Sequence, residues 1–326
     1  MLNFNLQSRL TQLQSSEPLG ISNSSERHIW ILRDDELGGF WGTKYRKFYS
    51  IIEYCLAEDV TQIICTGGIN SNSIAAAAVL CQEAGISVTA FAVDDHADDS
   101  QAPRGNRLII RTAIPPERLI IVPRNEKQSI TERMREAARN YELGGAKVLI
   151  LEEGGGCQEA VKGGLTLADD VLRPRSEWPD GDAPTHIFID SGTGLSAACL
   201  AAGLFAANIA AAKSIKLHVI QMAGFDEQIQ HAFNSWVTPV TGVTWDNVSR
   251  SVRVYRPLSP RSYGATSSEL FSFIKSIARE QGILTDPVYS AKLFARAFDL
   301  IKGQNLKGRI LIVHTGGISG LLGYSF

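Results

Sequence analysis

The stretch TQIICTGGINSNSIAAAAVLC, residues 61–81, contains the structural unit that decides the fold of this 326-residue chain. The β-branched run Thr61–Cys65 predicts a short strand, Gly67 and Gly68 predict a turn, and the alanine-rich run Ile74–Cys81 predicts a helix. The same unit recurs at Lys147–Leu151 before Gly154–Gly156, His186–Ile189 before Gly192–Gly194, Leu217–Gln221 before Gly224, and Arg309–His314 before Gly316–Gly317.

Strands that alternate with helices predict an α/β fold with mostly parallel sheets, because a parallel crossover needs a connection of helix length. Ser87–Ala92 and Leu119–Val122 predict further strands, and Ile130–Leu143 and Ser268–Gln281 predict further helices. In such sheets ligands bind at the carboxyl ends of the strands, where these glycine turns lie. Five such turns are more than packing alone requires, so we expect some of them to line a ligand site.

Composition and charge exclude several classes of protein. The net charge of −2 gives no basic footprint for nucleic acid or an anionic membrane surface. No apolar run reaches the roughly 18–20 residues of a membrane span, and Met1–Gln14 lacks the pattern of a secretory signal. We therefore expect a cytoplasmic protein. The cysteines are scattered singly among apolar neighbours, which predicts buried free thiols rather than disulfides or a metal site: Cys55, Cys65, Cys81, Cys157 and Cys199.

The turn at Asp190–Ala197 is the best candidate for binding a phosphate. A glycine turn that opens a helix presents backbone N–H groups and the positive end of the helix dipole to an anion. The turn also fits the G-x-G-x-x-A dinucleotide pattern, but the next strand ends at Gln221-Met222 without a carboxylate before Asp226. This favours a phosphate monoester over NAD. The alternative is a turn that only packs the helix close to the strand.

A second polar turn, Thr66–Ser73, directly precedes the helix predicted at Ile74–Cys81. Helix capping explains one serine or asparagine of this turn but not the whole cluster. A substrate carboxylate or a polar cofactor atom would explain the rest, and the sequence leaves capping and binding both open.

Lys44 lies in the segment Gly42-Thr43-Lys44-Tyr45-Arg46-Lys47, between an aromatic, glycine-rich stretch and the helix expected at Phe48–Leu56. A lysine can attack a carbonyl carbon when desolvation or neighbouring cations lower the pKa of its ammonium group. Arg46 and Lys47 supply such cations. A solvated surface lysine is the alternative.

Two polar stretches connect the predicted elements. In Asp94–Gly105 the acidic residues and His96 allow a metal site, but neighbouring residues of one loop do not all converge on one ion, so a solvated loop is favoured. Pro174–Pro184 reads as a linker between two lobes.

Five motifs in a fixed order resemble the family of D-cysteine desulfhydrases and 1-aminocyclopropane-1-carboxylate deaminases. These are pyridoxal-phosphate enzymes of fold type II, the tryptophan synthase β-like fold. The Lys44 segment resembles the family's G-N-K-x-R-K, and Gly67–Asn72 is similar to its G-G-I-Q-S-N turn. The remaining three are Tyr263-Gly264, Asp286–Lys292, which resembles D-P-V-Y-[T/S/E]-G-K, and His314–Gly317, which resembles H-[T/L]-G-G.

The resemblance implies two three-layer α/β lobes with mostly parallel twisted sheets and pyridoxal phosphate in the cleft between them. A small domain at 48–162 would be inserted in a large domain formed by 1–47 and 163–326. A homodimer is also implied.

The resemblance also implies a role for each matching residue. Lys44 would carry the cofactor and move the α-proton, and Ser71 would take the carboxylate of a small amino-acid substrate and take part in proton transfer. Asn72 would contact the phenolic oxygen of the cofactor. The other implied residues are Gly192, Thr193, Gly194, Leu195 and Ser196 around the phosphate, Tyr263 and Tyr289 facing the substrate, and Ser290 and Thr315 at the cofactor ring.

Ser290 and Thr315 bear on the reaction, because the resemblance implies glutamate and leucine at these positions in the deaminases. A hydroxyl at the ring nitrogen suits α,β-elimination better than cyclopropane ring opening, which needs a stronger electron sink. Ser73, Thr43 and Ala291 depart from the family's residues, and a synthase that catalyses β-replacement would show such changes. The deaminase reaction also stays open as an alternative. A further alternative, from a different functional class, is a binding protein that keeps the fold but does not catalyse a reaction.

Overall fold

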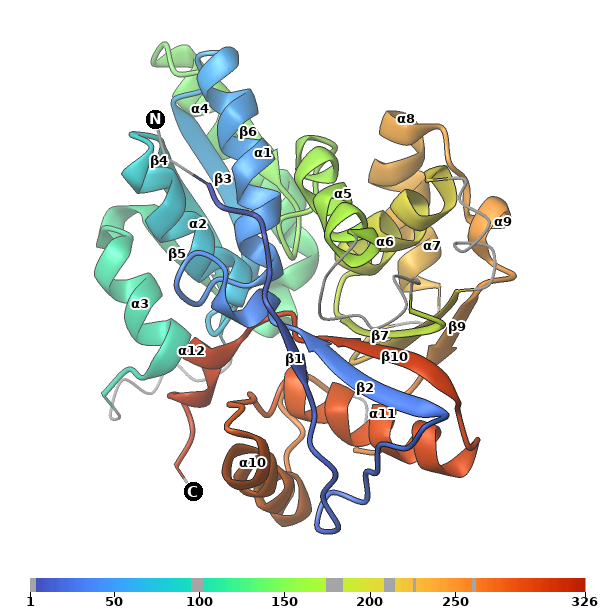
Figure 1. Cartoon of the computed structure of the whole chain (residues 1–326). Helices are drawn as coiled ribbons and strands as arrows, with labels where there is room; N and C mark the ends of the chain where they lie inside the picture. Colours follow the sequence, from blue (N-terminus) through green and yellow to red (C-terminus); the bar gives the residue numbers. More distant parts are fainter. Residues whose placement is uncertain are drawn as a thin grey trace. The chain divides into compact units, whose positions relative to one another are not determined.

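The computed structural model describes residues 4–94, 102–173, 184–207, 215–224, 227–259 and 262–325 (Figure 1). The contacts divide the chain into two compact units. The first unit holds Lys44–Gly163, Ser319–Ser325 and Phe4, and the second holds Asn5–Thr43 and Gly164–Ile318. The expected division into an inserted domain at 48–162 and a larger domain from 1–47 and 163–326 stays a prediction.

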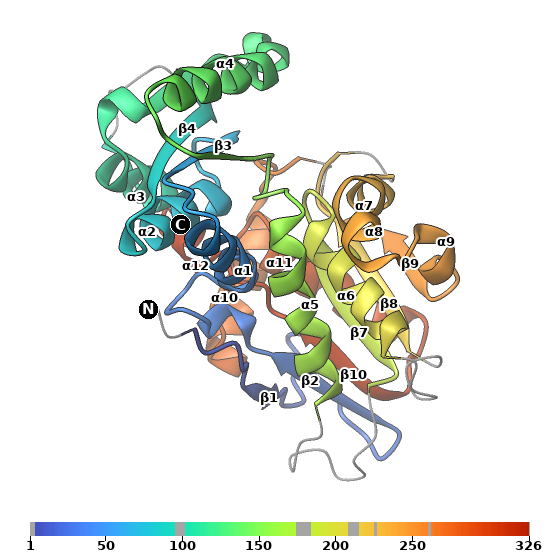
Figure 2. The same ribbon diagram turned by 90° about the horizontal axis from the view of Figure 1, so that it is seen from above.

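The first unit is built on a four-stranded parallel sheet in the order β5-β4-β3-β6. Figure 2 shows helix α4 on one face of these strands, and helices α1 and α2 on the other. Ile64 and Phe91 of the strands pack with Met134 of α4 in a buried cluster. The elements are β3 (Gln62–Gly68), β4 (Ser87–Val93), β5 (Leu119–Val122), β6 (Val148–Leu151), α1 (Thr43–Ala57), α2 (Asn72–Glu83), α3 (Gly105–Ala113) and α4 (Ile130–Leu143).

The second unit is built on a six-stranded sheet in the order β1-β2-β10-β7-β8-β9. Among these described strands, only β1 is antiparallel to its neighbour. Figure 1 shows helices α5 and α6 on one face of the sheet, and α10 and α11 on the other. The strands are β1 (Leu10–Gln12), β2 (Arg27–Leu32), β7 (His186–Ser191), β8 (Lys216–Gln221), β9 (Val252–Tyr255) and β10 (Gly308–Val313). The helices are α5 (Glu159–Leu172), α6 (Leu195–Ala206), α7 (Gln228–Ala232), α8 (Thr238–Thr241), α9 (Trp245–Val248), α10 (Ser268–Gln281) and α11 (Ser290–Gly303). Helix α12 (Ile318–Leu321) follows β10, and its residues from Ser319 onward belong to the first unit.

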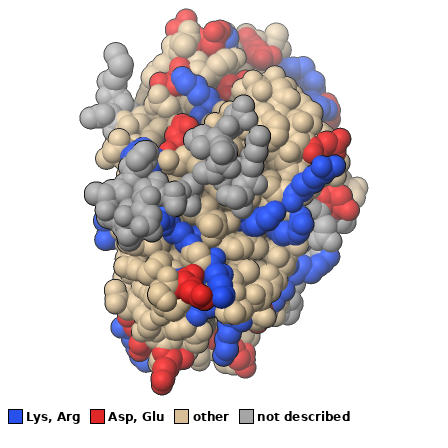
Figure 3. Space-filling model, turned by 45° about the vertical axis from the view of Figure 1, so that its right-hand side comes forward, with Lys and Arg blue, Asp and Glu red and all other residues tan. Residues whose placement is uncertain are grey.

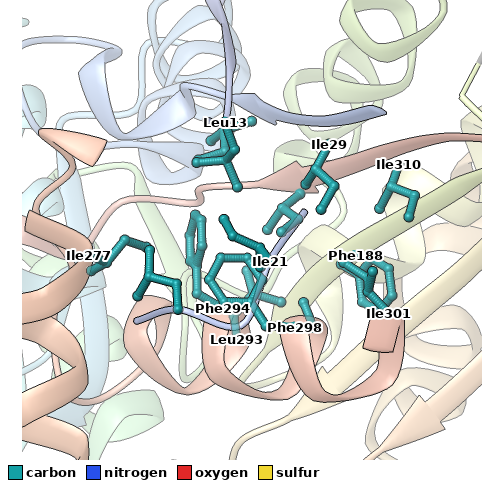
Figure 4. Packing of buried hydrophobic residues seen from close by; sticks show 14 of the residues in the cluster. Leu13, Ile21, Ile29, Phe188, Ile277, Leu293, Phe294, Phe298, Ile301 and Ile310 are labelled. Carbon is teal, nitrogen blue, oxygen red and sulfur yellow. The ribbon is translucent and has the colours of Figure 1, made fainter. Parts of the chain in front are cut away.

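The core of the second unit joins the strands to α10 and α11 (Figure 4). Ile29, Phe188 and Ile310 come from three neighbouring strands, and Phe294 and Phe298 come from α11. Burial of each such side chain contributes roughly 1.5–3 kcal/mol. This apolar layer fixes the strands, and therefore the turns that follow them.

In both sheets the strand order reverses beside a glycine turn. In the first unit the chain passes from β3 to β4 and β5 on one side, whereas β6 lies on the other side of β3. In the second unit it passes from β7 to β8 and β9, whereas β10 lies on the other side of β7. Such reversal points are where α/β sheets bind ligands.

The predicted α/β fold with mostly parallel sheets is confirmed, and all seven predicted strands form, within three residues of their expected ends. Strands β1, β2 and β9 were not predicted. Helix α1 begins at Thr43 and not near Phe48, so Lys44 lies in its first turn. Two features fix this start: Gly42 adopts a φ of +63°, and the Thr43 N–H donates at 2.9 Å to the carbonyl oxygen of Thr315, which is distant in the sequence.

Three further features of the described residues concern surface charge, apolar helices and cysteines. On the face drawn in Figure 3, basic and acidic side chains are interspersed and much of the surface is uncharged. Among the described helices, none is long and apolar enough to cross a membrane. The five cysteines are buried and free, as predicted. The described residues form no cluster suited to a metal ion, and most of the acidic loop (95–101) and of the expected linker (174–183) lies outside them.

Candidate active site

The turn between β7 and α6 presents an uncapped helix N-terminus. Gly194 is the N-cap residue of α6 with a φ of +92°, and no described side chain caps the helix there. A Cβ atom on Gly194 would lie 2.6 Å from the carbonyl oxygen of Gln228, so only glycine fits. The hydroxyl of Ser191, which precedes this turn, is buried and has no hydrogen-bond partner among the described residues. Backbone N–H groups and a free hydroxyl are the donors that a phosphate needs.

Two tyrosines lie against this turn. A Cβ atom on Gly192 would lie 3.2 Å from Oη of Tyr263 and 3.3 Å from Cε1 of Tyr289. The two rings are 5.7 Å apart between centroids. Lys292 of α11, 1% exposed, donates from Nζ to the carbonyl oxygen of Ser262 at 2.9 Å and so holds the segment that carries Tyr263. Burial lowers the pKa of Lys292, and Asp286 partly opposes this effect.

Two of the predicted hydroxyl groups are bound to buried carboxylates. Oγ of Ser290 donates to Asp286 at 2.7 Å, and Oγ1 of Thr315 donates to Asp190 at 2.5 Å. Asp286 also accepts from the backbone N–H groups of residues 288, 289 and 290. Thr315 follows strand β10, and Asp190 is the second-last residue of β7. These two strands are neighbours, beside the point where the strand order reverses. Gln221, where a dinucleotide site expects a carboxylate, donates instead to the carbonyl oxygens of Gly192 and Ala223.

In the first unit, the turn between β3 and α2 is capped by its own serine. Ser71 is the N-cap residue, and its Oγ accepts from the N–H groups of Ser73 and Ile74 at 3.1 and 3.3 Å. Because both bonds use the oxygen as acceptor, the hydroxyl proton of Ser71 remains available to a ligand. Glycine at position 67 leaves room for the Ser71 side chain, because a Cβ atom there would lie only 3.1 Å from Oγ of Ser71.

Lys44 shares the first turn of α1 with two buried cations. Arg46 is 1% exposed and Lys47 is 2% exposed, and Nζ of Lys47 donates to the carbonyl oxygen of Gly154 at 2.7 Å. This bond holds the start of α1 against the glycine turn after β6. The start of α5 packs so closely on α1 that a Cβ atom on Gly163 would collide with the carbonyl oxygen of Arg46.

Several residues that bind the predicted site residues were given no role at the site from the sequence. Asn106 of α3 donates to Asn72, and Gln221, Asp190 and Asp286 bind backbone or hydroxyl groups of the predicted site residues. Within the second unit the structure brings Gly192, Tyr263 and Tyr289 together, and joins Thr315 to Asp190. The roles proposed for the predicted residues are not decided by these contacts.

The family follows from a comparison with known proteins. The family model described as "Pyridoxal-phosphate dependent enzyme" matches residues 6–316. The chain belongs to the pyridoxal-phosphate dependent enzymes. It is therefore an enzyme of the lyase or deaminase type that uses pyridoxal phosphate, as predicted.

Named relatives and solved structures agree with this membership. The chain is 26% identical over 335 residues to D-cysteine desulfhydrase of Yersinia pestis, covering 98% of both chains. It is 25% identical over 347 residues to D-cysteine desulfhydrase of Serratia proteamaculans, again covering 98% of both. The crystal structure of an ACC (1-aminocyclopropane-1-carboxylate) deaminase homologue matches with a TM-score of 0.77 at 22% identity, over 98% of this chain and 92% of that one. O-ureido-L-serine synthase matches with a TM-score of 0.64 at 14% identity, over 95% and 88%. These structures confirm the fold type.

The described residues fit the phosphate of the cofactor. The donors at the start of α6, the unpartnered Ser191 hydroxyl and the space that Gly194 leaves suit a phosphate monoester. The Gln221 amide nitrogen donates to two carbonyl groups, and no carboxylate stands where a dinucleotide site expects one.

Proposed function

We propose that this enzyme catalyses α,β-elimination on a small amino acid with a β-leaving group, with D-cysteine as the first candidate. With water, D-cysteine would give pyruvate, ammonia and sulfide. Ser290 carries the proposal: it is fully buried, bears a hydroxyl and not a carboxylate, and its proton is engaged by Asp286. A neutral group at that position suits loss of a good leaving group better than ring opening of a cyclopropane. Two relatives that match over 98% of this chain carry the name D-cysteine desulfhydrase.

The turn before α6 and the turn before α2 would bind different groups of the cofactor and substrate. The donors at the start of α6, with Thr193 and Ser196, would hold the phosphate, and Asn72 would donate to the phenolic oxygen. The Ser71 hydroxyl would donate to the substrate carboxylate. When bound, pyridoxal phosphate supplies an electron sink that stabilises negative charge at the α-carbon of an amino acid.

Lys44 would hold the cofactor and, once the substrate amine has displaced it, take the α-proton. The buried cations Arg46 and Lys47 at the same end of α1 disfavour a second ammonium and so favour the neutral, basic form of an amine nearby. Tyr263 and Tyr289 would border the substrate, because they lie against Gly192 of the phosphate turn.

β-Replacement is the second candidate, favoured by the small side chain at position 73. Ser73 is buried, and its Oγ would lie 3.0 Å from a Cβ atom on Gly155, so no aromatic ring stands where the resemblance implies histidine. A β-replacement synthase would show such a loss of the ring. Formation of a substituted alanine from cysteine, in place of pyruvate, would identify this reaction. The deaminase reaction has less support, because this chain has Ser290 where the resemblance implies glutamate in the deaminases.

Two further properties belong to the proposal. We propose a homodimer, on the family resemblance alone, and a reducing, cytoplasmic location. Five buried free cysteines support the location, because such thiols persist in a reducing compartment.

The test is the visible absorption spectrum of the purified protein with pyridoxal phosphate, followed by a pyruvate assay with D-cysteine. We expect an absorption band that D-cysteine perturbs, and Lys44→Ala should lose the band and about 10²–10⁴-fold of the activity. Lys162→Ala is the control, because Lys162 is exposed on the same unit and pairs only with Glu53 among the described residues. A wild-type protein without a band would overturn the proposal, and a band without pyruvate would direct it to β-replacement.

A further inference from the structure

A chain of short hydrogen bonds in the first unit ends at Asn72. Nδ2 of Asn106, in the first turn of α3, donates to Oδ1 of Asn72 at 2.6 Å and to the carbonyl oxygen of Asn70 at 3.0 Å. Oδ1 of Asn106 accepts from Oγ of Ser319 at 2.6 Å. Asn106 is 3% exposed and Ser319 is 6% exposed, so water competes little for these bonds.

The direction of every bond in this chain follows from one unambiguous acceptor. The carbonyl oxygen of Asn70 can only accept, so the Asn106 atom that faces it must be the amide nitrogen. Oδ1 of Asn106 therefore faces Ser319, whose hydroxyl donates. The second hydrogen of the Asn106 nitrogen can only go to an acceptor, which makes the nearby Asn72 atom its Oδ1. The NH₂ group of Asn72 is then turned away from Asn106, and among the described residues it donates to none.

The backbone is adapted to keep Asn106 in place. Gly105, directly before it, adopts a φ of +53°, and a Cβ atom there would lie 2.8 Å from the carbonyl oxygen of Ser319 and from N of Gly323. Glycine therefore allows the C-terminal segment to approach the start of α3. The close contact between the two segments places the Ser319 hydroxyl within hydrogen-bond distance of Asn106.

We propose that Asn106 is a positioning residue that fixes the side-chain amide of Asn72 with its NH₂ group directed to the ligand, and that Ser319 holds Asn106 in the orientation this requires. The proposal rests on the proposed function, in which Asn72 donates to the phenolic oxygen of pyridoxal phosphate. It assigns to the C-terminal segment a part in the chemistry of the cofactor, although that segment supplies no group to it.

Asn106→Asp is the deciding variant, because aspartate has nearly the same shape but cannot donate. A carboxylate facing Oδ1 of Asn72 would turn that amide around, so that it presents an acceptor to the cofactor. A donor at a phenolic oxygen favours the anionic form, and its loss should move the pH midpoint of the visible band upward by about one unit. The dissociation constant of the cofactor should rise about tenfold.

Three further variants separate positioning from mere packing. Ser325→Ala removes another bond between the same segments, from Arg104 at 2.7 Å, and should leave the midpoint unchanged. In an Asn72→Ala background, Asn106→Asp should cause no further shift. Ser319→Ala should shift the midpoint in the same direction by a smaller amount, and it decides the matter if Asn106→Asp does not fold in a thermal unfolding scan.

The outcomes distinguish this proposal from the proposed function. A wild-type band with an unchanged midpoint in folded Asn106→Asp, or an equal shift without Asn72, overturns the positioning role and leaves the enzyme proposal intact. A wild type that never develops a band overturns the enzyme proposal, and the positioning role with it.

Discussion

The turns that open α2 and α6 follow parallel strands at equivalent points of their sheets, yet they offer a ligand different groups. At α2 the side chain of Ser71 already accepts from two backbone N–H groups. At α6 the N-cap is Gly194, and no described side chain makes a capping hydrogen bond to the helix. A dianionic phosphate needs several free backbone donors, whereas a carboxylate or a phenolic oxygen can be bound by one or two side-chain donors. The difference in capping therefore supports the proposal that α6 binds the phosphate and α2 the smaller polar groups.

The α6 turn should be the more sensitive of the two, and Gly194→Ala should have the largest effect. Alanine would adopt a left-handed conformation and contact the carbonyl oxygen of Gln228, which together cost roughly 2–5 kcal/mol of unfolding free energy. Cofactor affinity should fall strongly, because the first turn of α6 would shift. Urea unfolding and titration with pyridoxal phosphate measure both effects.

Gly282→Ala is the matched control for this variant. Gly282 caps α10 with a φ of +67°, and a Cβ atom there would meet nothing within 4 Å. We expect only the conformational cost of roughly 1–2 kcal/mol and unchanged cofactor affinity. Equal losses of affinity in the two variants would contradict the assignment of the phosphate to α6.

The strands beneath the two turns differ in how they respond to acid. Gln62 and Thr89, on β3 and β4, form a neutral pair at 3.3 Å, whereas His186 and His218, on β7 and β8, share a hydrogen bond of 3.0 Å. Burial, then His186, lowers the pKa of His218 to about 4 from its ordinary value of 6.5. The unfolded chain therefore binds a proton between pH 6.5 and 4 that the folded second unit does not bind. This part of the stability is complete above pH 6.5 and is lost as the pH falls toward 4.

His218→Phe tests this difference, because phenylalanine can keep the stacking on Phe188 and Tyr255. The loss of unfolding free energy between pH 6.5 and 4 should shrink by on the order of 3 kcal/mol. Hydrogen exchange at pH 5 should show the second unit opening before the first in the wild type. A variant with the same pH dependence as the wild type would exclude His218 as the acid-sensitive group.

The sequence predicts regular elements well where the pattern is local. Apolar runs before glycines located β3, β7 and β10 because buried parallel strands are continuously apolar. Strand β9, Val252–Tyr255, was missed although its alternation of apolar and polar residues was visible, because it is only four residues long. The start of α1 was misplaced because the bond from Thr43 to Thr315 joins residues 272 positions apart.

In the candidate site, too, the sequence predicts residues that belong to local motifs and misses those that depend on long-range contacts. Lys44, Ser71 and the α6 turn carry local motifs, so the sequence could single them out. Asn106 is one polar residue at the start of a short amphipathic helix, and its partner Ser319 lies 213 positions away. No spacing within the chain connects them. Gly105 directly before Asn106 was a weak signal, because glycine at a helix start permits a close approach of another segment.

Ser71→Ala should have the smallest effect on stability, and it separates capping from ligand binding at the α2 turn. Loss of the two capping bonds should cost about 1 kcal/mol of unfolding free energy. If the free Ser71 proton binds the substrate carboxylate, KM for D-cysteine should also rise about tenfold, since a hydrogen bond to a charged group is lost. Ser267→Ala is the matched control, because Ser267 caps α10 through a bond to Leu270 N at 3.2 Å. It should lose the same stability and leave KM unchanged. An unchanged KM in Ser71→Ala as well would reduce Ser71 to a helix cap, and the substrate carboxylate would then need another donor.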